Sequence, residues 1–555
     1  MAYGSTLDGR TDSAAVRKRR GAFFTPPELA SYLSSFAVRS SSDAVLEPSF
    51  GEGEFLLAVG RRLLELGVSE TQMPSHLMGC ELHAESAQAA QARLAQQGIH
   101  SAMRVGDFFF LEAAPTFDAV VGNPPYIRYQ NFSGAQAQRA REDCLRAGVR
   151  IDALASSWAP FVVHAAQFLR PGGRMALVLP AELLSANYAA PVRRFLIEGF
   201  SEVNLVLFEE PVFPEVQEEV VLLLAEGFGW GPTDSIRLRQ VRSSGDLTAA
   251  GDSVIPVAGD GRWPVGVEGR AAEDLLSRLD AGSFVSLGEW GRIRLGAVTG
   301  SNGYFALTPS RVEELGLGKD DVVPLCPPGS AHLRQLDLSQ ARWERLGAKG
   351  ERTLLFYPGD QPSRAARSYI ARGEALGVSG AYKCRTRSPW WRVPGVGACD
   401  AFLTYMNGFG PNLCVNEAGL AYLNSVHGVH FGEGHRELGM GVLPTLFLSS
   451  VTQLSAEVRG RSYGGGILKL EPREACRVSV VSPDCADAMA SAVLDAAPRA
   501  SELLGRGRRE EAGTLVDALL VREGVMDEFD VREAKEVLGR LRGRRNARGA
   551  ARGRR

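Results

Sequence analysis

The first half of the chain predicts a doubly wound α/β fold, and three observations support that prediction. Short apolar runs alternate with stretches whose apolar residues have helical spacing, which is the pattern of a parallel sheet with crossover helices. Glycine and acidic residues follow several of these runs, at the strand ends where open sheets of this kind bind ligands. The last two runs are about a dozen residues apart, too few for a helical crossover, so this closing pair is expected to be antiparallel.

The expected elements follow one another in a regular order. Strands are expected at the apolar runs 44–46, 77–82, 117–121, 174–179, 203–208 and 220–225, with one more just before Asp107. Helices are expected where apolar residues recur with a helical period, at 54–66, 84–97, 157–169 and 191–198. Together these elements delimit an α/β domain at 21–227.

The remaining segments are less regular. Residues 228–280, rich in Gly, Pro, Asp and Ser, predict a linker that holds at most a pair of strands. Short strands and turns at 281–483 predict a mixed α+β domain, and 484–542 returns to helical spacing. The N-terminus at 1–20 is expected to be flexible, and the arginine-rich tail at 543–555 is expected to be disordered.

Composition excludes several classes of protein. Of the 555 residues, 45% are hydrophobic and 23% are charged, close to globular averages, which argues against wholesale disorder or a fibrous repeat. The longest apolar runs fall far short of the ~18 residues that a membrane span needs. The N-terminus lacks the apolar stretch of a signal peptide, and the eight cysteines include no C-x-x-C pair. We therefore expect a cytoplasmic protein without a membrane partner.

Charge is divided unevenly along the chain. Residues 21–230 hold 14 basic and 24 acidic side chains, whereas residues 281–482 hold 22 basic and 17 acidic ones. Residues 540–555 add eight arginines and no acid. This division favours a polyanion bound by the second half, although uneven charge is common in proteins that bind none.

The segment FDAVVGNPPYIRY, residues 117–129, carries the strongest chemical signal. A buried strand leads into Asn123, Pro124, Pro125 and Tyr126 at its carboxyl end. Two successive prolines fix the backbone and remove two amide donors, so nearby carbonyls remain as acceptors. The Asn123 oxygen beside such a carbonyl suits a planar amine that donates both hydrogens, and Tyr126 can stack on a flat ring. An ordinary strand-terminating turn uses the same residue types.

The segment VLEPSFGEGEFL, residues 45–56, has the strand, glycine turn and helix of a nucleotide-type cofactor loop. It departs from the dinucleotide pattern G-x-G-x-x-G, because Leu56 occupies the third glycine position. Glu81 ends the second strand and could hold two ribose hydroxyls, and Asp107 follows the third and could accept from an adenine amine. Each acid alone could be a helix cap or a solvated loop residue. Their order along the chain is what indicates a cofactor site.

This order of motifs resembles that of the gamma-class N6-adenine DNA methyltransferases, the TaqI-like enzymes of type II restriction-modification systems. GAFFTPPELA at 21–30 resembles their N-terminal cofactor motif, and FLRPGGRMALVLP at 168–180 resembles their strand-five region. The antiparallel ending is typical of class I methyltransferases. The resemblance covers 21–227 and implies a seven-stranded, mostly parallel, S-adenosylmethionine-binding sheet followed by a mixed α+β target-recognition domain at 281–483.

The resemblance also implies roles for single residues and no metal. Asn123 and Pro124 would receive the target amine of a flipped adenine, with Tyr126 and Phe213 stacking on its two faces. The S-adenosylmethionine site would be formed by Phe24, Thr25, Glu47, Ser49, Gly51 and Gly53, with Glu81 at the ribose and Asp107 at the adenine. Three histidines in HGVHFGEGH are interpreted as structural, because no cysteine pair accompanies them and methyl transfer needs no metal.

Beyond residue 288 the resemblance is weaker, but 287–308, 382–394 and 460–472 are similar to recurrent segments of the recognition half. YKCRTRSPWWRVP, at 382–394, contains no acid. Its arginines suit phosphate or guanine contacts and its aromatics suit base stacking, unless the tryptophans anchor a surface loop to the core. The residues expected to contact DNA are Lys383, Arg385, Arg387, Trp390, Trp391 and Arg392.

The expected function is transfer of a methyl group from S-adenosylmethionine to the N6 amine of adenine within a short double-stranded DNA sequence. Such a bacterial protein would protect DNA from a separate cognate endonuclease. Enzymes that act on ribosomal RNA or on a glutamine of release factors also use N-P-P-Y, although they are generally smaller. A catalytically silent DNA-binding specificity subunit is a third alternative, but it need not keep that motif.

Overall fold

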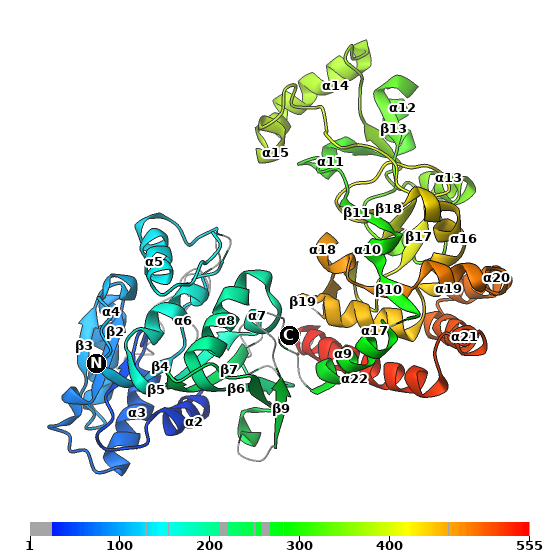
Figure 1. The fold of residues 1–555 in the computed structure, drawn as a ribbon. Helices are drawn as coiled ribbons and strands as arrows, with labels where there is room; N and C mark the ends of the chain where they lie inside the picture. Colours follow the sequence, from blue (N-terminus) through cyan, green and yellow to red (C-terminus); the bar gives the residue numbers. More distant parts are fainter. Residues whose placement is uncertain are drawn as a thin grey trace, which may run out of the picture. The chain divides into compact units, whose positions relative to one another are not determined.

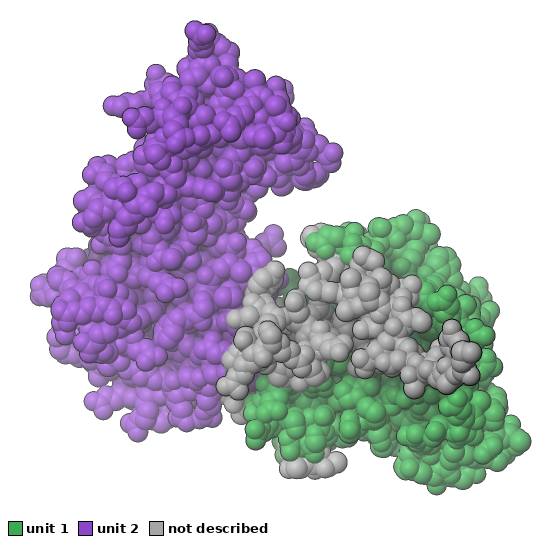
Figure 2. All heavy atoms as spheres, turned by 180° about the vertical axis from the view of Figure 1, so that it is seen from behind, with its two compact units in different colours: residues 1–267 green, residues 268–555 purple. Residues whose placement is uncertain are grey.

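The computed structural model describes residues 25–553 with short gaps and divides into two compact units. The gaps are 128–129, 154, 211, 214–219, 248–250, 257–262, 264–266, 281 and 464–465. The division falls between Val267 and Glu268 and is drawn in two colours in Figure 2. Each unit has a hydrophobic core of its own, so each is described by itself.

Unit 1 is built on one nine-stranded sheet with the order β3-β2-β1-β4-β5-β7-β6-β8-β9. Strands β1 to β5 are parallel to one another, whereas β7 is antiparallel to both β5 and β6. The predicted α/β fold and antiparallel closing pair are therefore confirmed. The strands are β1 (Val45–Glu47), β2 (Leu77–Glu81), β3 (Ala102–Val105), β4 (Phe117–Gly122), β5 (Leu169–Pro180), β6 (Phe200–Phe208), β7 (Val220–Phe228), β8 (Ser235–Val241) and β9 (Asp252–Pro256).

Helices cover this sheet on both sides, which is why its central strands read as continuous apolar runs. Figure 1 shows α2 and α3 along one face and α6 and α8 along the other. The six predicted apolar runs fall on β1, β2 and β4 to β7, and the four predicted helices correspond to α3, α4, α6 and α8. The helices of unit 1 are α2 (Pro27–Ala37), α3 (Glu54–Glu65), α4 (Ala84–Ala95), α5 (Gly134–Arg146), α6 (Trp158–Ala166), α7 (Glu182–Ser185) and α8 (Ala190–Gly199).

The sheet is larger than the seven strands expected, because the pair of strands allowed for in the linker, β8 and β9, joins its edge. β8 pairs in parallel with β6, and β9 pairs antiparallel with β8. Only Ile236, Leu238 and Val241 of β8 and Ile255 of β9 are buried. Strands at the edge of a sheet expose most of their residues, so their polar composition hides them from a search for apolar runs.

Unit 2 is a mixed α+β structure with several small antiparallel sheets, as expected. A four-stranded sheet has the order β11-β18-β15-β17, and pairs or triplets of strands form the others, β10-β21, β12-β14-β13 and β16-β20-β19. Among the described residues no single helix has the length and apolar content of a membrane span, whereas 433–446 and 450–459, bent by 91°, pass that test as a pair. The strands are β10 (Phe284–Ser286), β11 (Gly291–Leu295), β12 (Ala306–Leu307), β13 (Val322–Pro324), β14 (Leu354–Phe356), β15 (Ala401–Leu403), β16 (Met406–Asn407), β17 (Leu413–Val415), β18 (His427–Phe431), β19 (Arg461–Tyr463), β20 (Ile467–Lys469) and β21 (Ser479–Val481).

Part of unit 2 has a separate small core, which we call the small lobe. It comprises β12, β13, β14, α12, α14 and α15, and its core includes Tyr304, Phe305, Phe356 and Tyr369. The remaining helices pack around the larger core of the unit. The helices of unit 2 are α9 (Val267–Leu279), α10 (Leu287–Trp290), α11 (Asn302–Phe305), α12 (Pro309–Glu314), α13 (Gln340–Ala348), α14 (Arg364–Ala375), α15 (Tyr382–Arg385), α16 (Arg436–Leu446), α17 (Ser450–Arg459), α18 (Pro472–Ala475), α19 (Pro483–Ala488), α20 (Ala490–Gly505), α21 (Arg509–Arg522) and α22 (Glu528–Gly553).

The last helix extends into the arginine-rich tail that was expected to be disordered. α22 continues to Gly553, and Arg545 within it is only 3% exposed. The Arg545 guanidinium pairs with the Glu457 carboxylate and donates to the Gly408 carbonyl oxygen at 2.9 Å. A composition count misses this element, because a buried carboxylate partner lets an arginine pack inside the unit.

Candidate active site

The residues predicted to form the cofactor and target sites meet at the carboxyl ends of three neighbouring strands. β1 pairs in parallel with β2 on one side and with β4 on the other. Glu47 is the last residue of β1, Glu81 is the last residue of β2, and Asn123 directly follows β4. The order of strands therefore brings together three segments that are far apart in the sequence.

The glycine loop between β1 and α3 has the geometry that its sequence predicts. Gly51 and Gly53 have φ values of 51° and 81°, in the left-handed region that favours glycine. A Cβ atom on Gly53 would lie 2.9 Å from Leu94 Cδ1 and 3.1 Å from Ala90 Cβ, so the loop packs closely against α4. α3 begins directly afterwards, at Glu54, without a side-chain cap on its first amides.

Glu81 connects the end of β2 to the glycine loop. One carboxylate oxygen accepts a hydrogen bond from the Gly51 amide at 2.9 Å, and the other accepts from the His83 amide at 2.9 Å. A carboxylate oxygen can accept more than one hydrogen bond, so these contacts orient Glu81 and leave it able to receive hydroxyl groups.

Glu47 is a buried carboxyl group with an unused oxygen. The side chain is 1% exposed, and its Oε2 atom has no hydrogen-bond partner among the described residues. Burial and the nearby Glu81 carboxylate raise the pKa of Glu47 well above its ordinary value, although the Leu56 amide opposes this shift. An unpaired buried carboxyl is costly, and a cationic ligand next to it would favour the ionised form. The positively charged S-adenosylmethionine fits this requirement.

Asp107 caps the short 3-10 helix Phe108–Phe110, where its Oδ1 accepts from the Phe109 amide at 3.0 Å. Two exposed apolar side chains, Leu82 and Phe110, lie next to Glu81 and close to Asp107 in the chain. Neither residue was predicted from the sequence. Their signal is visible only in the structure, because an apolar residue is not conspicuous until it is found exposed.

Asn123 is held by three hydrogen bonds from different parts of the chain. Its Nδ2 donates to Thr25 Oγ1 at 3.3 Å, and its Oδ1 accepts from the Tyr126 hydroxyl at 2.8 Å. Its backbone carbonyl accepts from Ser49 Oγ at 3.3 Å. Thr25 and Ser49 were both predicted as cofactor residues, so the structure links that set directly to N-P-P-Y. Phe24, predicted beside Thr25, lies outside the described residues.

Among the three consecutive carbonyls of Asn123, Pro124 and Pro125, only the middle one receives no hydrogen bond from the described residues. The Asn123 carbonyl accepts from Ser49, and the Pro125 carbonyl accepts from Ser157. Ser157 also accepts from the Ile127 amide at 2.9 Å, which fixes the far side of the turn. The Pro124 carbonyl is therefore an acceptor that the protein positions without using.

Tyr126 and Phe213, predicted to stack on a target base, are both largely buried. Tyr126 is 7% exposed, and its hydroxyl also lies 2.9 Å from the Val178 carbonyl oxygen of β5. Phe213 lies between β6 and β7 and is 6% exposed. Stacking on a base remains a prediction for both rings, and the structure adds a role that the sequence did not indicate, in which the Tyr126 hydroxyl orients Asn123.

The predicted DNA-contacting stretch, 382–394, contains residues of two kinds in the small lobe of unit 2. Lys383 and Arg385 of α15 are exposed. The Lys383 ammonium lies 5.5 Å, and the Arg385 guanidinium 5.6 Å, from the centre of the exposed Tyr382 ring. These cations are available to a phosphate backbone.

The other predicted contacts of this stretch also have partners inside the protein. The Arg387 guanidinium donates to the Thr299 carbonyl at 3.0 Å and to the Val298 carbonyl. Arg392 pairs with Asp360. Trp390 Nε1 donates to Glu374 Oε1 at 3.1 Å, and the Trp391 ring packs against the Trp390 ring with centres 6.1 Å apart. Half-buried Arg387, Trp390 and Trp391 thus stabilise the lobe, whatever else they contact.

The three histidines that superficially suggested a metal site each contact another part of unit 2. His427 is buried, with Nε2 2.8 Å from the Leu470 carbonyl oxygen, and burial lowers its pKa. His430 Nε2 lies 3.2 Å from the Tyr422 hydroxyl, and His435 packs edge-on against Trp290. In the part of the chain that the structure describes, no group of three His, Cys, Asp or Glu side chains is arranged to hold a metal ion.

The strand order of unit 1, with β7 antiparallel beside β5, is that of a class I S-adenosylmethionine-dependent methyltransferase. Residues 3–226 match the family described as N-6 DNA Methylase, and residues 269–521 match the C-terminal domain of the type II methyltransferase M.Eco57I. Residues 3–226 are thus similar to the N-6 DNA methylases, and the relatives that match most of the chain are type II methyltransferases.

Individual relatives extend over most of the chain. The type II methyltransferase M.XamI of Xanthomonas campestris pv. amaranthicola is 26% identical over 84% of this chain and 85% of its own length. M.AccI of Acinetobacter calcoaceticus is 21% identical over 82% of this chain and 84% of its own. Among solved structures, the type IIL restriction-modification enzyme MmeI in complex with DNA has a TM-score of 0.53 and 12% identity, covering 95% of this chain and 75% of that one. This last likeness supports the fold of both units.

Proposed function

We propose that this protein is a type II modification methyltransferase that methylates the N6 amine of one adenine in a short double-stranded DNA sequence. The observation that carries the proposal is the pair of acceptors after β4, Asn123 Oδ1 and the Pro124 carbonyl, beside the glycine loop after β1. Similarity to the N-6 DNA methylase family and to type II methyltransferases supports DNA as the substrate.

The proposed chemistry requires little more than orientation and two acceptors. The adenine amine is a weak nucleophile, because its lone pair conjugates with the ring. As its nitrogen attacks the methyl carbon, positive charge develops on the two amine hydrogens, and acceptors fixed in advance stabilise that charge. Thr25 keeps the Asn123 amide from rotating by accepting from its Nδ2 atom, so Oδ1 is the atom that faces the amine.

S-adenosylmethionine would supply a methyl group on a positively charged sulfur. The S–CH3 bond would break as the N–CH3 bond forms, leaving a neutral thioether, and the methylated amine would lose one proton to water. The residues proposed to hold it are Glu47, Gly51, Gly53 and Glu81, with Asp107 at the adenine end. Glu47 is suited to a cationic group because its Oε2 atom is buried and unpaired within the described residues. Exposed Leu82 and Phe110 are proposed to cover the adenine ring of S-adenosylmethionine. This contact would remove the apolar surface of both side chains from water.

The target adenine has to leave the duplex before it reaches a site at the sheet edge. Flipping costs a few kcal/mol, which stacking on aromatic rings offsets. Tyr126 and Phe213 are proposed to provide this stacking. Exposed Lys383 and Arg385 are proposed to hold the phosphate backbone in unit 2. A separate endonuclease that cuts the same sequence would be the partner of such an enzyme.

A single-turnover assay tests the proposal. Labelled cofactor, with the protein in excess, is incubated in parallel with genomic DNA, ribosomal RNA and release-factor protein, and the products are analysed for N6-methyladenine. Asn123→Ala should lower the rate on DNA by about 100-fold or more, equivalent to ~3 kcal/mol, while cofactor binding survives. Asn131→Ala, at an exposed position outside the site, is the matched control. A near-parental rate for Asn123→Ala, or label in RNA or protein alone, would contradict the proposal.

A further inference from the structure

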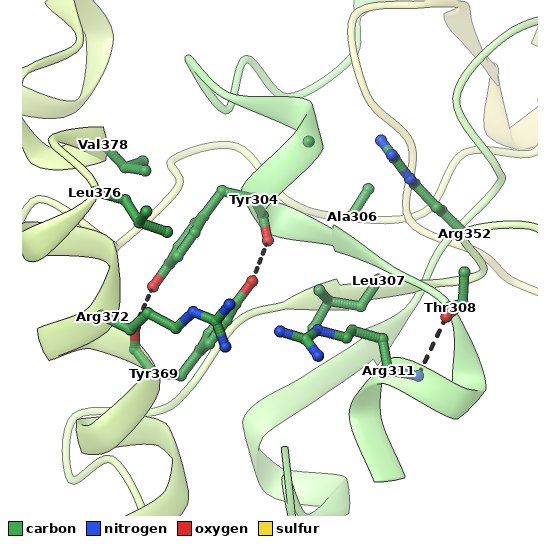
Figure 3. Close-up of a pocket in the computed structure, with 11 residues that line it drawn as sticks. Tyr304, Ala306, Leu307, Thr308, Arg311, Arg352, Tyr369, Arg372, Leu376 and Val378 are labelled. Atoms are coloured by element: carbon green, nitrogen blue, oxygen red, sulfur yellow. Dashed lines mark hydrogen bonds between the residues drawn. The ribbon is translucent and has the colours of Figure 1, made fainter. Parts of the chain in front are cut away.

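A pocket in the small lobe of unit 2 is not explained by the methyl-transfer site or by the stretch 382–394. Its volume is about 490 Å³, and side chains from α12, from the segment before β14 and from α14 surround it (Figure 3). This volume falls within the range of small-ligand sites. The residues that decide its chemistry are Tyr304, Tyr369, Arg311, Arg352 and Arg372.

The two tyrosines form a rigid wall of this pocket. Their rings are stacked with centres 4.5 Å apart and an angle of 2° between planes. The Tyr304 hydroxyl donates to the Tyr369 carbonyl at 2.8 Å, and the Tyr369 hydroxyl donates to the Tyr304 carbonyl at 2.9 Å, as the dashed lines in Figure 3 show. Reciprocal hydrogen bonds between buried groups fix both rings, so the pocket is formed in advance of any ligand.

Three arginines approach the pocket from different segments. Arg311 and Arg372 extend toward one another in front of the tyrosines, and Arg352 approaches from the other side (Figure 3). Arg311 is paired with Glu314, whereas Arg352 and Arg372 form no ion pair with a side chain that the structure describes. Of the described residues that line the pocket, none is acidic. Convergent cations without an acid repel one another, and an anion between them would relieve this repulsion.

We propose that this pocket binds a phosphate group, and that the phosphate belongs to the backbone of bound DNA. This inference rests on the proposed function. The planar guanidinium fork matches phosphate oxygens and can bind them through two parallel hydrogen bonds. The segment 352–394, which supplies two of the three arginines and includes the stretch 382–394, holds eight basic and two acidic residues.

The position of the pocket supports the backbone as the source of the phosphate. Tyr304, which lines the pocket, also packs against Trp390 with ring centres 5.7 Å apart. A Cβ atom on Gly373 would lie 2.7 Å from both the Trp390 ring and the Tyr304 hydroxyl, so α14 and the stretch 382–394 are in close contact there. The pocket and the exposed cations Lys383 and Arg385 thus belong to one continuous part of the lobe. A strand of DNA that contacts one can present a phosphate to the other.

The test compares the double variant Arg352→Gln/Arg372→Gln with the control Arg364→Gln. Arg364 is exposed on the same helix α14 and does not line the pocket. The first measurement is the affinity for a fluorescent duplex of arbitrary sequence as a function of salt, because phosphate contacts do not depend on sequence. Arg352 and Arg372 would share one phosphate, so losing that contact should reduce the slope of log affinity against log salt by about 0.9. The control should keep the parental slope.

The second measurement is calorimetric titration with inorganic phosphate and with adenosine monophosphate. If the parental protein binds either compound and the double variant does not, while the DNA-binding slope of the variant is unchanged, the pocket binds free phosphate. That outcome would overturn the assignment of the phosphate to the DNA backbone. A parental DNA slope together with no phosphate binding would overturn the inference. Thermal melting checks that the variants fold. Neither measurement involves methyl transfer. Failure of the proposed function would be seen separately, as absence of methyl transfer to DNA by the unaltered protein.

Discussion

Tyr126→Phe separates two roles that the whole side chain combines. The hydroxyl carries one hydrogen and lies 2.8 Å from Asn123 Oδ1 and 2.9 Å from the Val178 carbonyl oxygen. Phenylalanine keeps the ring and its stacking surface but leaves both buried acceptors without this donor. The loss of a donor to a buried acceptor costs ~1–3 kcal/mol, so the free energy of unfolding should fall by about this amount.

The kinetic effect of Tyr126→Phe should be moderate. Asn123 keeps its bond to Thr25, so its amide becomes less well oriented but is not released. We expect single-turnover methyl transfer to slow by about tenfold, which corresponds to ~1.4 kcal/mol. Cofactor affinity should not change. Tyr126→Ala should lose a further 1–3 kcal/mol or so of base stacking, and a duplex mismatched at the target adenine should partly restore its rate.

A control variant distinguishes positioning from a general loss of stability. Tyr422→Phe removes the hydroxyl of an equally buried tyrosine in unit 2, which lies 3.2 Å from His430 Nε2 and outside the arginine pocket. It should lower stability without changing the single-turnover rate at saturating DNA. Parental methyl transfer in Tyr126→Phe, or an equal slowing in Tyr422→Phe, would refute the idea that the Tyr126 hydroxyl orients Asn123.

Three further predictions concern the cofactor loop and unit 2. Because burial raises the pKa of Glu47, affinity for S-adenosylmethionine should increase with pH as this carboxyl ionises. Glu47→Gln should bind S-adenosylmethionine weakly, with an affinity that does not change with pH. The pKa of Glu47 is higher in the folded than in the unfolded protein, so the folded state loses stability as pH rises above the pKa of the unfolded protein. The melting temperature of Glu47→Gln should not show this decrease with pH. Gly53→Ala should destabilise unit 1 by more than about 1 kcal/mol and weaken cofactor binding in calorimetry, since φ is 81°. In salt titrations, Lys383→Ala/Arg385→Ala should reduce the DNA-binding slope by up to about 1.8, whereas Arg387→Ala should mainly lower the melting temperature.

The sequence predicts the centre of the catalytic sheet well and its edges poorly, for a physical reason. Strands such as β4 and β5 are covered on both faces, so burial selects apolar residues throughout and the run is visible in the sequence. β8 and β9 bury only alternate residues or fewer, and their charged residues look like those of a linker. The last turns of α22 were missed because only a partner distant in sequence, Glu457, explains the burial of Arg545.

The sequence predicted which strand ends carry the candidate site, but not the contacts between their side chains. Motif order placed Glu47, Glu81 and Asn123 at neighbouring strand ends, because parallel topology determines where such ends meet. The sequence could not indicate that Tyr126 donates to Asn123, since this depends on a side-chain rotamer. It also gave no sign of the arginine pocket, whose lining comes from three segments that only the folded lobe brings together.

Adenine methylation within a defined DNA sequence can be measured directly inside cells. Long-read sequencing of DNA from cells that express the protein, and from cells that express Asn123→Ala, reports modified adenines at every position. We expect N6-methyladenine in nearly all copies of one short sequence with the parental protein and at background level with the variant. Modification that is absent, is found on another base, or persists unchanged in Asn123→Ala would contradict this expectation.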